Sequence, residues 1–145
     1  MRTRFYRLAI LSAMLFIAGR ATCQSSPKNW VAYYQDEHLL IEVAPAERRD
    51  SVNGIFNNYY VLRVTNSTDR RLNVSFRKEL EYNLRPVTSD KLSTLTLGPH
   101  QMIEGSELPE SDKGLRVFIN QVDGMNKNVL TGFSITGVQS SEITE

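Results

Sequence analysis

The side chains with the strongest chemistry in this 145-residue sequence are one cysteine, Cys23, and two histidines, His38 and His100. Thiolates and imidazoles are the common ligands of structural zinc, but such sites draw on closely spaced pairs such as CxxC or HxxxH. Neither histidine has another histidine or cysteine at such a spacing. The acidic stretch ESDKG at 110–114 also departs from the ligand spacing of an EF-hand calcium loop. We therefore expect no bound metal and no other cofactor.

Motifs for covalent catalysis are missing as well. The sequence has no GxSxG elbow, no SxxK pair and no glycine-rich phosphate loop. Glu79 and Glu81 are two residues apart, which on a strand places both on one solvated face. A Ser–His–Asp triad assembled from distant segments is the enzymatic arrangement that the sequence leaves open, with His38 or His100 as the base. The sequence favours a protein without enzymatic activity.

Residues 1–23 have the three parts of a secretory signal peptide. Three arginines precede the apolar run LAILSAMLFIAG at 8–19, and small residues follow it. This run is shorter than the roughly 20 residues of a transmembrane helix, and no second run of that length occurs, so we expect no membrane span. The pattern predicts an exported protein of the periplasm, the cell envelope or the extracellular space.

Two outcomes of signal processing differ in what becomes of Cys23. Cleavage after Cys23 would leave Gln24 as the new N-terminus, whereas cleavage after Ala21 would retain the cysteine. A lipid anchor on Cys23 is possible but less favoured. Arg20 and Thr22 stand where a lipoprotein signal usually has an aliphatic and a small residue. We expect Gln24 to be the first residue of the exported protein.

The charge balance argues against nucleic acid as a partner. The chain carries 17 basic and 16 acidic side chains. Four arginines and no acid lie in residues 1–23, so the remainder has 13 basic and 16 acidic side chains, a net charge of −3. Nucleic-acid binding depends on neutralising phosphates with a basic surface.

From Trp30 onward the sequence reads as short strands separated by turns, with apolar residues at every second position. The first expected strand lies in segment 38–47 and is ended by Pro45. The others are 56–66, 72–82, 92–97, 101–105, 115–122 and 130–138. Seven or eight strands in about 110 residues indicate an all-β, antiparallel, immunoglobulin-like β-sandwich, with a small β-barrel as the alternative. The expected domain covers 30–138, after a flexible segment at 24–29 and before a polar tail at 139–145.

Segment 72–82 has the clearest alternation. It places Leu72, Val74, Phe76, Leu80 and Tyr82 on one face. Lys78 interrupts that face, so we expect a bulge or the strand's exit from the core there. The turn formers NSTD at 66–69 predict that 59–82 is a β-hairpin. Asn66 and Asn73 also begin N-glycosylation sequons, and in a eukaryotic host Asn66 would be a credible acceptor.

Aromatic residues concentrate in the first half of the domain. Trp30, Tyr33, Tyr34 and Tyr59 form a possible interaction surface, since tyrosine and tryptophan are enriched at interfaces. The loops 83–91 and 106–114 are further expected contact regions, because loops on a rigid sandwich commonly carry binding.

Two stretches carry a resemblance to a known group. YYVLRVTNSTDRRLNVSF at 59–76 and LTLGPHQMIEG at 95–105, followed by LRVFINQV and LTGFSITGV, resemble small exported β-sandwich proteins of Bacteroidetes-type bacteria. The group implies no catalytic residue. The leading hypothesis is an exported, non-enzymatic protein that contacts another envelope or extracellular protein. The alternative is a ligand- or glycan-binding module or a protease-inhibitor-like domain.

Overall fold

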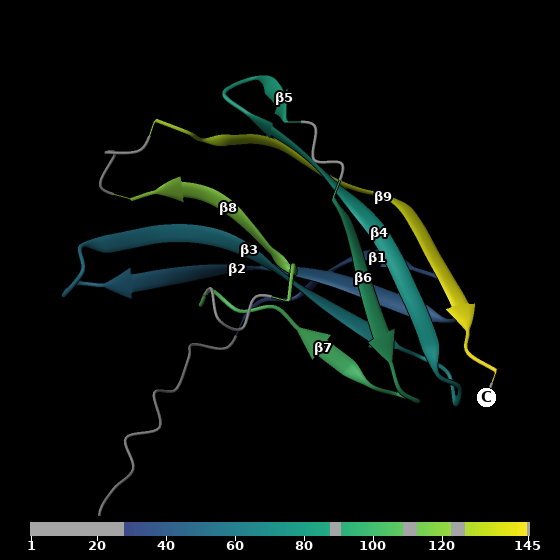
Figure 1. Cartoon of the computed structure of the whole chain (residues 1–145). Helices are drawn as coiled ribbons and strands as arrows, with labels where there is room; N and C mark the ends of the chain where they lie inside the picture. Colours follow the sequence, from purple (N-terminus) through teal and green to yellow (C-terminus); the bar gives the residue numbers. More distant parts are fainter. Residues whose placement is uncertain (1–27, 88–90, 109–112, 123–126, 145) are drawn as a thin grey trace, which may run out of the picture.

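The computed structural model describes residues 28–87, 91–108, 113–122 and 127–144, which form two antiparallel sheets packed face to face (Figure 1). The first sheet consists of β1 (Val31–Gln35), β2 (Leu39–Asp50), β3 (Ile55–Asn66), β7 (Met102–Glu104) and β8 (Arg116–Gln121). The second consists of β4 (Leu72–Tyr82), β5 (Arg85–Val87), β6 (Leu92–Leu97) and β9 (Leu130–Glu142). The predicted all-β antiparallel sandwich is confirmed, and its two separate sheets differ from the closed barrel of the alternative.

Several predicted features fall on residues outside this description. The signal peptide at 1–23, its cleavage site at Cys23 and Gln24, and most of segment 24–29 belong there. Within the described ranges, no helix is long and apolar enough to cross a membrane.

The hairpin of the first sheet is β2–β3, closed by a turn that contains Asn53 and Gly54. Gly54 has a φ of 65°, a left-handed conformation that glycine adopts without steric cost. β2 continues through Pro45 to Asp50, although Pro45 was expected to end the strand. β1 pairs with β2 only up to Val43, so Pro45 lies at a sheet edge, where a missing N–H is tolerated.

β7 and β8 pair end to end along the other edge of β3. At their junction Gly105 N–H donates to the Leu62 carbonyl and Leu62 N–H donates to the Leu115 carbonyl, at 2.8 and 2.9 Å. A Cβ on Gly105 would lie 2.2 Å from the Leu115 carbonyl oxygen, so this close approach requires glycine. Gly105 and Leu115 therefore lie next to each other at this junction, although nine residues separate them in the chain.

In the second sheet β4 is central, with β9 along one edge and β6 and then β5 along the other. The predicted hairpin over 59–82 is wrong, because β3 and β4 belong to different sheets. The turn at 67–71 instead carries the chain from one layer to the other. β9 also continues to Glu142, so most of the expected tail at 139–145 is strand.

The crossing at 67–71 depends on a buried amide. Asn66 is fully buried; its Nδ2 donates to the carbonyls of Arg70 and Gly98, at 2.6 and 2.8 Å. Its Oδ1 accepts from the backbone N–H and the hydroxyl of Thr68. The nitrogen that would carry a glycan is thus engaged inside the fold, which corrects the suggestion that Asn66 is an acceptor.

The core lies between β2–β3 on one side and β4, β6 and β9 on the other. The alternation predicted for β4 is confirmed: Leu72, Val74 and Phe76 are buried, whereas Asn73 and Arg77 are exposed. Other fully buried members come from the first sheet, from β6 and from the residue before β8, namely Leu39, Ile41, Leu62, Val64, Leu97 and Leu115. Toward the end that carries β5, the two layers diverge (Figure 1). We call this end of the sandwich the splayed end.

Candidate functional site

Trp30 lies on the outward face of the first sheet. The Arg63 guanidinium sits 4.3 Å from the centre of its indole ring and forms two hydrogen bonds to Glu42, at 2.6 and 2.7 Å. The hydrogen bond with Glu42 raises the pKa of Arg63. Just upstream, Lys28 pairs with Glu104 of β7 at 2.8 Å. Trp30 therefore fixes the start of the domain against β3 and β7 rather than standing free.

The three tyrosines of the predicted interaction surface lie in separate places. Tyr33 is 43% exposed, lies at a bulge in β1 and packs against Phe133 of β9, at 5.6 Å between ring centres. Tyr34 packs against the core and donates to Asp36. Tyr59 is buried, with the Arg116 guanidinium 4.8 Å from its ring centre. The structure does not bring Trp30 and these tyrosines together as one surface.

A different aromatic cluster lines a groove of about 610 Å³ at the splayed end. The rings of Tyr82 on β4 and Phe118 on β8 stack at 6.4 Å between centres. The Tyr82 hydroxyl donates to the Phe118 carbonyl at 2.6 Å, and Tyr59 meets Phe118 edge-on. Burial raises the pKa of Tyr82, so the phenol stays a neutral donor at physiological pH. One strand from each sheet therefore contributes to the groove floor.

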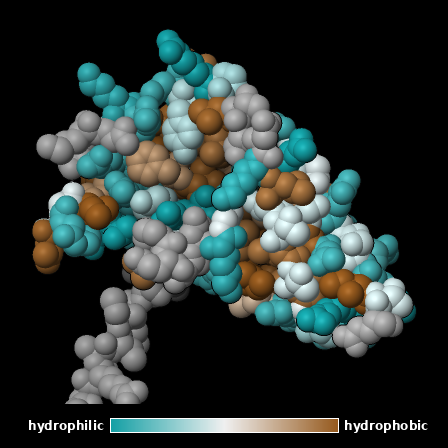
Figure 2. All heavy atoms as spheres, viewed as in Figure 1, coloured by the Kyte–Doolittle hydropathy of each residue, from teal (hydrophilic) through white to brown (hydrophobic). Residues whose placement is uncertain are grey.

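The groove rim is polar, and apolar side chains stand exposed around it. Besides the two aromatic rings, the lining consists of Asn83, Arg85, Val87 and Asn128. Val87 of this lining is exposed, as are Leu84 and Val129, which adjoin the lining residues Asn83 and Asn128 in the chain. Figure 2 shows hydrophobic side chains at the surface in the hollow below β5. The splayed end thus gathers exposed apolar residues from the β4–β5 turn, β5 and the start of β9.

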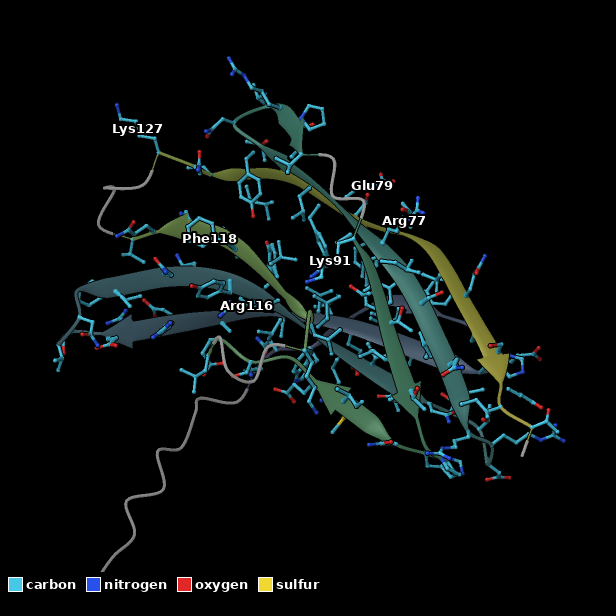
Figure 3. All side chains as sticks on the ribbon, in the orientation of Figure 1. Arg77, Glu79, Lys91, Arg116, Phe118 and Lys127 are labelled. Carbon is cyan, nitrogen blue, oxygen red and sulfur yellow. The ribbon has the colours of Figure 1, made fainter. Side chains whose placement is uncertain are left out.

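Among the residues that the structure describes around the groove, two exposed side chains are basic. Arg85 lines the groove, and Lys127 lies beside Asn128 at the start of β9. Figure 3 shows Lys127 and Phe118 on the side where the layers diverge, whereas Arg77 and Glu79 lie on the outward side of β4 and Lys91 lies at the start of β6. Glu79 accepts hydrogen bonds from Ser134 and Thr136 of β9. Its charge is therefore held on the outward face and away from the groove.

Side chains from the second sheet contact the edge of β8 that faces away from β3. Lys78 Nζ donates to the carbonyls of Gly114 and Arg116, at 2.5 and 3.1 Å. The hydroxyl of Tyr82 bonds the next carbonyl of that edge, at Phe118. The interruption of the apolar face by Lys78 is therefore an inter-sheet bridge, and it blocks strand addition at this edge.

The opposite end of the sandwich carries both histidines. His38, His100, Ser67 and Asp69 line a shallow groove of about 400 Å³ there. His100 Nε2 lies 2.6 Å from Asp69, with both side chains exposed. Across the described ranges neither histidine hydrogen-bonds a serine side chain, which a triad needs. Nor do those ranges hold a group of three His, Cys, Asp or Glu side chains suited to a metal ion.

Two parts of the groove were predicted from the sequence, although the groove itself was not. The loop 83–91 was an expected contact region, and Tyr82 was assigned to the inward face of β4. The stacking of Tyr82 on Phe118 had no sequence signal, because β4 and β8 never pair. Comparisons with protein-family models, curated protein sequences and solved structures gave no match for this chain.

Proposed function

We propose that this chain is an exported, non-enzymatic β-sandwich protein that acts through protein–protein contacts, and that the splayed end is its contact surface. The observation that carries the proposal is the collection of exposed apolar side chains around the aromatic groove. Leu84, Val87 and Val129 are each between 42% and 79% exposed. Contiguous apolar surface with a polar rim is typical of interaction sites on soluble domains.

The construction of the groove supports the same proposal. Tyr82 and Phe118 are held by stacking and by a hydrogen bond, so they present a rigid floor. Rigid aromatic groups give large contact area at little entropic cost on binding. Arg85 adds a side chain type that is enriched in interfaces.

Site-specific photocrosslinking tests the proposal in the cells that make the protein. A benzophenone amino acid at Val87 in β5 places the probe at the groove, and the same probe at Arg77 on the outward face of β4 is the matched control. We expect a discrete adduct of defined mass from Val87 and none from Arg77. No adduct from Val87, or the same adducts from both positions, would contradict the proposed surface.

Export has its own test. The mass of the intact protein from the cell envelope or medium gives its first residue, and we expect a chain that begins at Gln24 as glutamine or pyroglutamate. A chain that begins at Cys23 with acyl groups would instead place it on a membrane through a lipid anchor. A chain that retains residues 1–23 would contradict export by signal cleavage.

A further inference from the structure

The turn between β4 and β5 has an unusual residue at its second position. Tyr82 pairs with Arg85 across a two-residue turn, in which Asn83 and Leu84 have φ values of 51° and 62°. Two successive left-handed residues are the signature of a type I′ turn, which favours Asn followed by Gly. Asn83 fits that preference, whereas leucine in this conformation costs about 1–2 kcal/mol because its Cβ crowds the following carbonyl.

Packing does not explain the choice of leucine. Leu84 is 79% exposed, so its side chain adds little to the core. Elsewhere the chain uses glycine in this conformation, at Gly54, Gly114 and Gly137. Among the described non-glycine residues with positive φ, Leu84 is the apolar one, the others being Asn83, His100 and Lys113. A strained backbone that carries an exposed apolar side chain points to a function for that side chain.

The turn is held rigidly against the start of β9. The Leu84 N–H donates to the Thr131 hydroxyl at 3.0 Å, and Asn83 N–H donates to the Val129 carbonyl at 3.0 Å. Val129 N–H returns a bond to the Asn83 side-chain oxygen at 3.1 Å. Because the turn is already ordered, little conformational entropy is lost when Leu84 enters a binding pocket.

The charged residues beside Leu84 indicate what kind of pocket would receive its side chain. Arg85 follows Leu84 directly and Lys127 lies at the adjoining start of β9, and both are exposed. Glu81, on the other face of β4, is hydrogen-bonded to Thr131. A second copy of this chain would bring these cations together, whereas a pocket bordered by carboxylates would complement them.

We propose that Leu84 is the anchor residue of the interface, and that it inserts into an apolar pocket bordered by carboxylates on another protein. Arg85 pairs with those carboxylates at the pocket rim. This inference rests on the proposed function, since it names the residue and the partner chemistry of the same surface.

The test combines adduct yield with thermal stability in the protein exported by its own cells. The probe stays at Val87, and Leu84→Gly is compared with Val52→Gly, which removes a 92% exposed side chain at the β2–β3 turn. We expect Leu84→Gly to raise Tm by about 4–8 °C, because glycine relieves the strained turn. It should also lower adduct yield at least tenfold, as expected for an interface anchor. Val52→Gly should leave the yield unchanged.

Charge reversal tests the chemistry of the partner. Arg85→Glu should lower the adduct yield at least tenfold, whereas Arg77→Glu on the outward face should not change it. If the adduct from Val87 persists undiminished in Leu84→Gly, the anchor is refuted while the proposed surface stands. An adduct with twice the mass of this chain would refute the carboxylate-bordered partner in favour of a second copy. No adduct from Val87 in the parent would refute the proposed function itself.

Discussion

Replacing Lys78 by methionine should destabilise the sandwich far more than its partly exposed position implies. Methionine keeps an unbranched apolar side chain of similar length, so packing around the stem is largely retained. The ammonium group that joins β4 to the carbonyls of Gly114 and Arg116 is lost. The substitution therefore isolates the inter-sheet bridge from the core that surrounds it.

The expected loss follows from those two hydrogen bonds. A hydrogen bond with a charged donor contributes about 1.5–3 kcal/mol net, and more is lost when its partner is left buried without a replacement. Two bonds in a half-buried setting give about 2–4 kcal/mol for Lys78→Met. In a domain of about 110 residues, this corresponds to a fall in Tm of about 8–16 °C.

Urea unfolding of Lys78→Met beside Arg77→Met provides the measurement. Arg77 is the adjacent exposed residue of β4, and its replacement should change the free energy of unfolding by less than about 0.5 kcal/mol. Hydrogen exchange should rise at the Leu62 N–H, which β8 holds through the Leu115 carbonyl. Equal stability of the two variants would refute the bridge and leave Lys78 as an ordinary surface lysine.

Three further substitutions test other parts of the fold. Asn66→Asp should lower the free energy of unfolding in urea by about 2–4 kcal/mol, because a carboxylate cannot donate to the two carbonyls that now accept hydrogen bonds from the amide. An unchanged urea midpoint would contradict this. Gly105→Ala should lower Tm by 10 °C or more, since the added methyl meets the Leu115 carbonyl, and recovery of wild-type Tm would show that the junction can shift. Burial would raise the pKa of Asp36, but hydrogen bonds from His38, Tyr34 and Leu39 outweigh it and lower that pKa below 3.8. The Asp36 carboxylate therefore stabilises the fold above pH 3.8 and loses this effect as pH falls through its lowered pKa, so the stability gap to Asp36→Asn should be largest at pH 7 and shrink below pH 4.

The proposed interface extends what the sequence indicated about contact regions. The loop at 83–91 was expected to make contacts because it joins strands of a sandwich. The structure adds that its first residues form a rigid turn with a strained leucine, and that the turn stands beside a groove built by both sheets. The aromatic residues predicted to share one surface instead lie in separate places. Trp30 lies against Arg63, Tyr33 packs against Phe133 of β9, and Tyr59 lies against Arg116.

The sequence alone determined the all-β class and the inward face of β4, because strand alternation is a local property that burial must respect. It also located the turn at 66–69, since asparagine and aspartate tolerate left-handed backbone. The sequence did not determine which strands pair with one another. The 59–82 unit looked like a hairpin, yet β4 takes as its main partner β9, about 50 residues later.

Only the tertiary structure decided that pairing, and with it the site. The cost of closing a loop grows slowly with its length, so burial of apolar faces, rather than nearness in sequence, selects strand partners. That selection placed β8 opposite β4, which turned Lys78 into a bridge and brought Tyr82 onto Phe118. The strain at Leu84 likewise exists only because Tyr82 and Arg85 pair across a two-residue turn.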